Sequence, residues 1–147
     1  METIEEIESV WKKNQEIESI VLADKVIRAT LRWQRRPGGR YYLEAAVLVL
    51  ETNQLLRLTG FKGKLNRSFA LLYRNLPIRR YTWHQKDKNP DGQHIYGPHK
   101  HVWDEIYGEH LKYVPKGVPT GDINQELESF LKEVNIRRAG AYEPFLL

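Results

Sequence analysis

Apolar residues recur at helical spacing near both ends of the chain. Thr3-Ile4-Glu5-Glu6 has the pattern of a capping box, in which Thr3 accepts from the Glu6 amide and Glu6 reaches back. The apolar positions Ile4, Ile7, Val10 and Trp11 then predict a helix over about residues 4–14. A second amphipathic helix is predicted after Asp122 as N-cap, with apolar residues at Ile123, Leu127, Phe130, Leu131 and Val134.

Between these helices the apolar period changes to two, which is typical of strands. Residues 26–34 alternate apolar and polar side chains and predict a half-buried strand with a cationic outer face. Residues 41–51 predict another strand, whose apolar run indicates cover on both faces. A short turn is expected at Asn53-Gln54. Further strands are predicted at 55–62, 68–74 and 78–83, the last with Arg80, Thr82 and His84 on one face.

These elements predict a single α+β domain over residues 1–147. Short connections favour an antiparallel sheet of about five to seven strands, flanked by an N-terminal and a C-terminal helix. The chain has no cysteine, which excludes disulfides and thiolate metal sites and fits a cytoplasmic protein. No apolar run approaches the roughly 20 residues that span a bilayer, so we expect no membrane insertion.

The net charge of +4 is distributed unevenly along the chain. Residues 1–24 carry 2 basic and 7 acidic side chains, residues 25–88 carry 15 and 3, and residues 89–147 carry 6 and 9. The middle segment is therefore strongly positive. Such a block attracts polyanions, which predicts nucleic acid or a phosphorylated molecule as a partner, although a solvated basic face is the simpler interpretation.

Four of the five histidines lie in the short segment 94–110, and His84 precedes it across the turn signal Asn89-Pro90-Asp91-Gly92. If Pro98 opens an extended segment, His99 and His101 face the same volume. We expect the chain from His94 to return as a strand beside 78–84, which would bring His84 near His94. Residues 109–120 are expected to form a loop.

Paired imidazoles suit RNA cleavage without a metal, because histidine alone has an unperturbed pKa near neutrality. In this hypothesis His99 and His101 are the base and the acid, with His84 beside them. The remaining expected contacts to substrate are Arg80, His94, Tyr96, Lys100 and Tyr107.

Two alternatives remain open. His99, His101 and Glu105 have a spacing similar to the first motif of the cupin family, which would imply a divalent metal ion, although the C-terminal helix does not suit a cupin jelly roll. A non-catalytic module is the other alternative, with the cationic sheet recognising nucleic acid or a protein partner.

Residues 78–136 resemble an uncharacterised prokaryotic family of small proteins of unknown function. The resemblance lies in Asn89-Pro90-Asp91-Gly92, Pro98-His99-x-His101 and Glu105-x-Tyr107-Gly108. It implies no particular activity. By analogy with small prokaryotic proteins of this type, we expect a ribonuclease of a toxin–antitoxin or phage-defence system, with a cognate protein partner or inhibitor.

Overall fold

A computed structural model of the chain describes residues 3–64, 66–83, 87–88, 94–95, 99–104, 108–113 and 122–147. The side chains that it describes are those of residues 3–6, 12–64, 66–82 and 122–147. Among these residues neither helix combines the length and the apolar character that crossing a bilayer requires.

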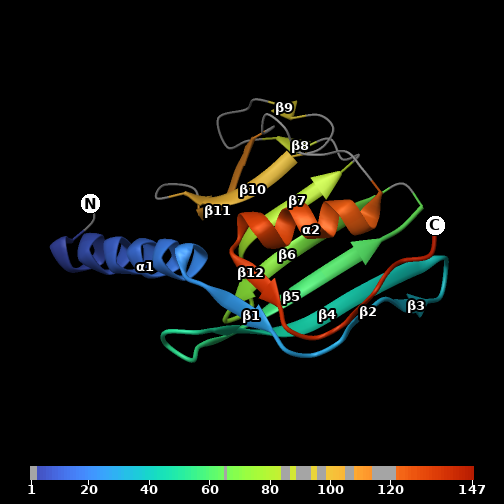
Figure 1. Ribbon diagram of the computed structural model, residues 1–147. Helices are drawn as coiled ribbons and strands as arrows, with labels where there is room; N and C mark the ends of the chain where they lie inside the picture. Colours follow the sequence, from blue (N-terminus) through green and yellow to red (C-terminus); the bar gives the residue numbers. More distant parts are fainter. Residues whose placement is uncertain are drawn as a thin grey trace.

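The first helix, α1 (Ile4–Leu22), begins at the predicted capping box, with Thr3 and Glu6 bonded to each other's backbone amides. It ends eight residues beyond the predicted boundary. Its last two turns continue because Ile17, Ile20 and Val21 pack into the core and are at most 6% exposed. Figure 1 shows that its N-terminal half extends beyond the sheet.

The sheet is mostly antiparallel and its central strands form a meander. The main sheet has the strand order β11-β10-β7-β6-β5-β4-β1-β12, with β3 paired to β4. Only β1 and β12 pair in parallel among the strands of this sheet that the structure describes. The predicted α+β class is therefore confirmed (Figure 1). The strands are β1 (Lys25–Ile27), β2 (Leu31–Arg32), β3 (Gln34–Arg36), β4 (Arg40–Val49), β5 (Leu55–Lys62), β6 (Arg67–Tyr73), β7 (Leu76–Trp83), β8 (Asp87–Lys88), β9 (His94–Ile95), β10 (His99–Asp104), β11 (Gly108–Tyr113), β12 (Ile136–Arg138) and β13 (Tyr142–Glu143).

The predicted strand at 26–34 is wrong, because the chain there divides into β1, β2 and β3. The middle of residues 26–34 forms hydrogen bonds with the C-terminal segment. The amide of Leu31 donates to Ala141 O at 2.9 Å, and the amide of Ala139 donates to Ile27 O at 2.9 Å. The Cβ of an alanine at Gly140 would lie only 2.5 Å from Ala29 O, so the two segments cross with almost no space between their backbones.

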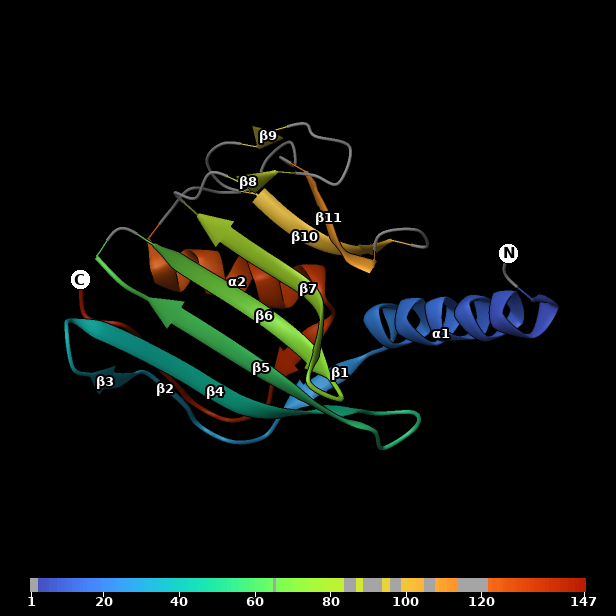
Figure 2. The ribbon, with the colours of Figure 1, turned by 180° about the vertical axis from the view of Figure 1, so that it is seen from behind.

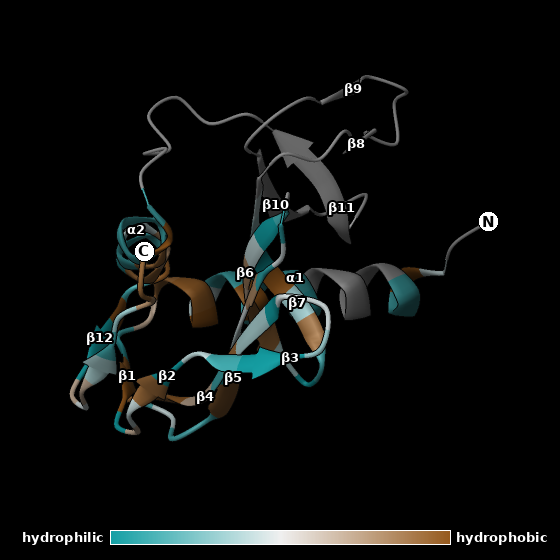
Figure 3. Cartoon of the chain, turned by 90° about the vertical axis from the view of Figure 1, so that its right-hand side faces the viewer, coloured by the Kyte–Doolittle hydropathy of each residue, from teal (hydrophilic) through white to brown (hydrophobic). Residues whose placement is uncertain are grey.

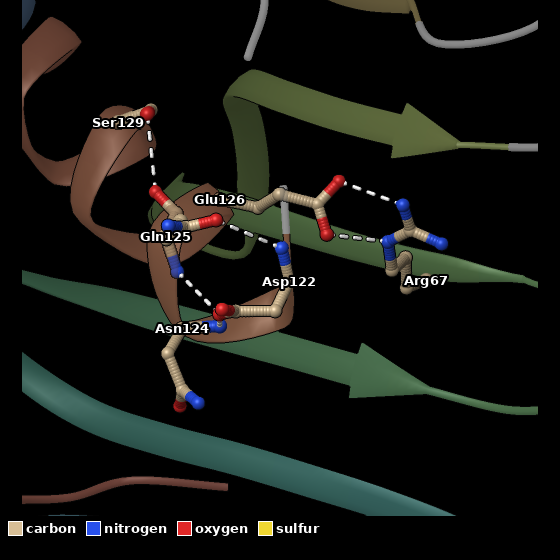
Figure 4. A network of polar contacts seen from close by, with 6 residues as sticks. All are labelled: Arg67, Asp122, Asn124, Gln125, Glu126 and Ser129. Carbon is tan, nitrogen blue, oxygen red and sulfur yellow. Dashed lines mark hydrogen bonds and ion pairs between the residues drawn. The ribbon is translucent and has the colours of Figure 1, made fainter. Parts of the chain in front are cut away.

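The second helix, α2 (Ile123–Glu133), lies on one side of the sheet (Figure 3). Asp122 is the predicted N-cap and accepts from the amides of Asn124 and Gln125 at 2.9 and 3.0 Å. The carboxylate of Glu126 is fully buried and receives a bidentate contact from Arg67 in β6, with Nη2 at 2.8 Å from Oε2 (Figure 4). This ion pair and the buried apolar stripe of α2 fix the helix against the strands.

Lys25 joins the C-terminal ends of both helices to the sheet. Its side chain is 1% exposed, and Nζ donates to the carbonyls of Val21, Ala23 and Val134 at 2.8, 2.7 and 2.8 Å. Carbonyls at a helix C-terminus have no partner within the helix, so a buried ammonium satisfies them. Burial also lowers the pKa of Lys25 to about 8.

The C-terminal segment packs on the same side of the sheet as α2. Asn124 holds it: Oδ1 accepts from the amide of Phe145 at 2.8 Å, and Nδ2 donates to Phe145 O at 3.1 Å. The Phe145 ring makes edge contacts with Trp33 and Tyr41, with ring centroids 5.8 and 4.8 Å away. The aromatic side chains on this side of β4 are therefore engaged by the chain itself.

Candidate nucleic-acid interface

The central strands separate a helix-covered face from a face that no helix covers in the described part of the chain (Figure 2). Alternate residues of β4 are buried, as in Leu43, Ala45 and Val47, whereas Glu44 and Ala46 between them are exposed. The prediction that residues 41–51 are covered on both faces is therefore wrong.

We call the uncovered side the open face. Its residues follow from the strand alternation and from the register, because directly opposed residues of antiparallel strands share a face. They are Gln34, Arg36, Arg40, Tyr42, Glu44, Ala46, Leu48, Leu55, Arg57, Thr59, Phe61, Ser68, Ala70, Leu72, Arg80 and Thr82, of which Ala70 and Thr82 are buried. Arg80 and Thr82 thus share a face, as predicted, while Tyr81 lies on the other.

Two rows of opposed residues run across the open face from β4 to β7. The first row is Tyr42, Phe61, Ser68 and Thr82, and the second is Glu44, Thr59, Ala70 and Arg80. At the backbone level the register continues into β10, where His99 lies opposite Thr82 and His101 lies opposite Arg80. Two of the predicted catalytic positions therefore belong to the strand that adjoins the open face.

The first row begins with an aromatic pair. The rings of Tyr42 and Phe61 have centroids 5.3 Å apart and are inclined by 56°. Tyr42 is 40% exposed and Phe61 is partly buried. Most of the surrounding side chains are polar or small, so this pair lies at the surface and does not belong to the buried core.

The open face is cationic. Among its described side chains are Arg36, Arg40, Arg57 and Arg80, against the single carboxylate of Glu44. Arg57 lies 3.5 Å from Glu44 and also donates to the side chain of Asn75 at 3.3 Å. Both members of this ion pair are largely exposed, so it is weak and leaves the guanidinium accessible.

Arg80 is the predicted site residue whose side chain the structure describes. It lies in β7 and is partly buried. Its cationic side chain on the open face, next to the backbone position of His101, suits the predicted contact to a phosphate.

The remaining predicted site residues lie wholly or partly outside the described residues. For His94, His99, Lys100 and His101 the structure gives the backbone pairing, while their side chains fall outside that part.

His94 pairs with Lys88 in the short hairpin of β8 and β9, so the prediction that it returns beside 78–84 is wrong. That position belongs to β10, and part of the predicted loop at 109–120 forms β11. The residues entirely outside the described part are His84, Tyr96, Glu105 and Tyr107.

No group of three possible metal ligands occurs among the side chains that the structure describes. The alternative metal site at His99, His101 and Glu105 lies outside that part and stays a prediction.

The two groups with the largest pKa shifts lie on the helix side of the molecule. Burial lowers the pKa of Lys25 to about 8 and raises the pKa of Glu133, in α2, to about 7. They are therefore not part of the open face.

The sequence interpretation missed the aromatic pair and Arg57. The register of the hairpin between β4 and β5 could have revealed the aromatic pair. Its turn lies at residues 50–53, with the amide of Asn53 donating to Val49 O at 2.9 Å and a positive φ of 58° at Asn53. This turn, instead of the predicted Asn53-Gln54, places Tyr42 opposite Phe61.

No family model, curated protein or solved structure matches the chain. The resemblance to an uncharacterised prokaryotic family therefore stays a prediction.

Proposed function

We propose that this protein binds RNA on the open face of its sheet and cleaves it with His99 and His101. The observation that supports the proposal best is the register of β10, which aligns both histidine positions with the rows of the open face. A histidine pair beside a cationic surface supplies proton transfer and phosphate binding together. The setting we propose is a toxin–antitoxin or defence system in the prokaryotic cytoplasm, with a cognate protein inhibitor.

The binding step uses the charge of the open face. Arg36, Arg40, Arg57 and Arg80 are spread over strands β3 to β7, so they meet several phosphates of one strand. Each neutralised phosphate releases counterions, and affinity should therefore fall steeply as the salt concentration rises. Guanidinium groups also bind phosphate in a bidentate manner, which orients the backbone as well as attracting it.

The cleavage step requires a base and an acid near neutral pKa. One imidazole takes the proton of the ribose 2′-hydroxyl, whose oxygen then attacks the adjacent phosphorus. The second imidazole, in its protonated form, gives its proton to the 5′-oxygen as the P–O5′ bond breaks. The products are a 2′,3′-cyclic phosphate and a 5′-hydroxyl. Arg80, which lies opposite His101 in the register, would stabilise the negative charge of the phosphorane.

The test measures binding and cleavage separately in EDTA. We expect wild-type protein to cleave a labelled RNA, and His101→Ala to lose cleavage while binding remains. His110→Ala is the matched control, because it removes an imidazole from the neighbouring strand β11 and should cleave normally.

Other outcomes would identify the alternatives. Binding without cleavage by the wild type would favour the non-catalytic module. Cleavage that EDTA abolishes and Glu105→Gln removes would favour the metal-dependent enzyme. Absence of RNA binding at moderate salt would contradict the proposal as a whole.

A further inference from the structure

We infer that the open face takes single-stranded RNA and that Tyr42 and Phe61 form a stacking site for one of its bases. This inference rests on the proposed function and adds the class of substrate and a subsite. The observation behind it is the aromatic pair, whose ring centroids lie 5.3 Å apart on a face with cationic and small side chains.

Neither ring belongs to the buried core. Tyr42 is 40% exposed, whereas the buried aromatic side chains of the helix side, such as Phe69 and Phe130, are 0% exposed. Tyr41, the preceding residue in β4, instead packs on Phe145 on the helix side. The exposed ring of Tyr42, beside the partly buried ring of Phe61, offers an apolar face to a planar ligand, and every nucleobase has such a face.

The surroundings of the pair suit a sugar–phosphate backbone. In the row that leads from Phe61 toward β10, the next residue is the small Ser68, which is partly exposed, followed by Thr82, which is buried. The small Ser68 leaves space beside the Phe61 ring, and its hydroxyl can donate to a phosphate oxygen. Arg40 precedes Tyr42 by two residues on the same face of β4 and would hold the phosphate beside a stacked base, whereas Arg57 lies four residues from Phe61 along β5 and would bind a more distant phosphate.

The distance between the pair and β10 sets the geometry of the substrate. Phe61 lies in β5, which is three strands from β10, and neighbouring strands are about 4.8 Å apart, so the span is about 14 Å. A few nucleotides of an extended single strand bridge such a span. A base stacked on Tyr42 and Phe61 would therefore lie outside the scissile dinucleotide and contribute to binding without taking part in the chemistry.

A duplex does not fit this arrangement. Bases within an RNA helix are paired and stacked on one another, so their faces are not available to side chains. Recognition through an aromatic face requires an unpaired base. The open face should therefore discriminate between strands by their pairing state and only weakly by sequence.

The experiment compares the affinity of a labelled single-stranded RNA with that of a duplex, both 2′-O-methylated to prevent cleavage. We expect wild type to prefer the single strand. Tyr42→Ala and Phe61→Leu should each weaken its binding at least about fivefold, the lower end of the roughly 1–3 kcal/mol measured per stacked base. Tyr42→Trp should keep the affinity, because it keeps an aromatic face.

Tyr41→Leu is the matched control, since it alters an aromatic residue of the same strand on the opposite face. Circular dichroism establishes that each variant is folded. Unchanged single-strand affinity in a folded Tyr42→Ala, or a preference for duplex, would overturn the inference while the proposed RNA binding stands. Failure of wild type to bind either RNA would overturn both.

Discussion

Lys25→Met tests how the two helices are held to the sheet. The substitution removes the ammonium that donates to Val21, Ala23 and Val134, which leaves three carbonyls without this donor. At about 1–3 kcal/mol for each unsatisfied group, the loss is near 6 kcal/mol. Methionine also removes the cost of burying the charge, which is about 3 kcal/mol for a pKa lowered from 10.5 to about 8. We therefore expect a loss of about 3 kcal/mol at pH 7.

The pH dependence gives this prediction a specific sign. Because the pKa of Lys25 is lower in the folded state, the unfolded chain binds more protons between pH 8 and pH 10.5. The free energy of unfolding of wild type should therefore rise with pH across this window, relative to the methionine variant. Urea unfolding at pH 7 and pH 10 should show a difference that widens by about 2–3 kcal/mol. A constant or narrowing difference would refute the reasoning, and a variant more stable than wild type at pH 7 would show that desolvation outweighs the lost donors.

Three further predictions concern packing, and urea unfolding with limited proteolysis measures them. Glu126→Gln should lower the free energy of unfolding by about 3 kcal/mol, because it leaves the mostly buried guanidinium of Arg67 without its carboxylate; an unchanged value would contradict this role. Asn124→Ala should cost about 2 kcal/mol and expose the segment around Phe145 to protease, since three hydrogen bonds to that side chain are lost; equal cleavage rates would argue against it. Gly140→Ala should unfold the protein or cost several kcal/mol, as the new Cβ would meet backbone carbonyls at 2.5 Å; a native-like stability would show that the backbones can separate.

Periodicity in the sequence predicted the elements whose partners are close along the chain. The meander from β4 to β7 and the start of α2 follow from alternation and capping, and both are confirmed. The predicted end of α1 was too early, although Ile17, Ile20 and Val21 continue the helical spacing. Polar residues between them obscured this signal.

Pairing between distant segments could not be read from local patterns. Residues 27–31 alternate like a strand, yet the two ends of this segment, Ile27 and Leu31, hydrogen bond with residues 139–141, more than 100 positions away. The histidine positions of β10 were predicted from their spacing, but their alignment with Arg80 and Thr82 depends on the pairing of β7 with β10. The aromatic pair of the open face similarly depends on the register of one turn.

The most direct test of the central claim is the chemistry of the RNA ends after incubation with the protein in EDTA. Mass spectrometry of a defined oligonucleotide should show fragments that end in 2′,3′-cyclic phosphate, with the complementary fragments beginning in a 5′-hydroxyl. The same fragments should be absent with His99→Ala and with His101→Ala. Intact RNA after prolonged incubation with folded wild type, or fragments with 5′-phosphate ends, would contradict the account.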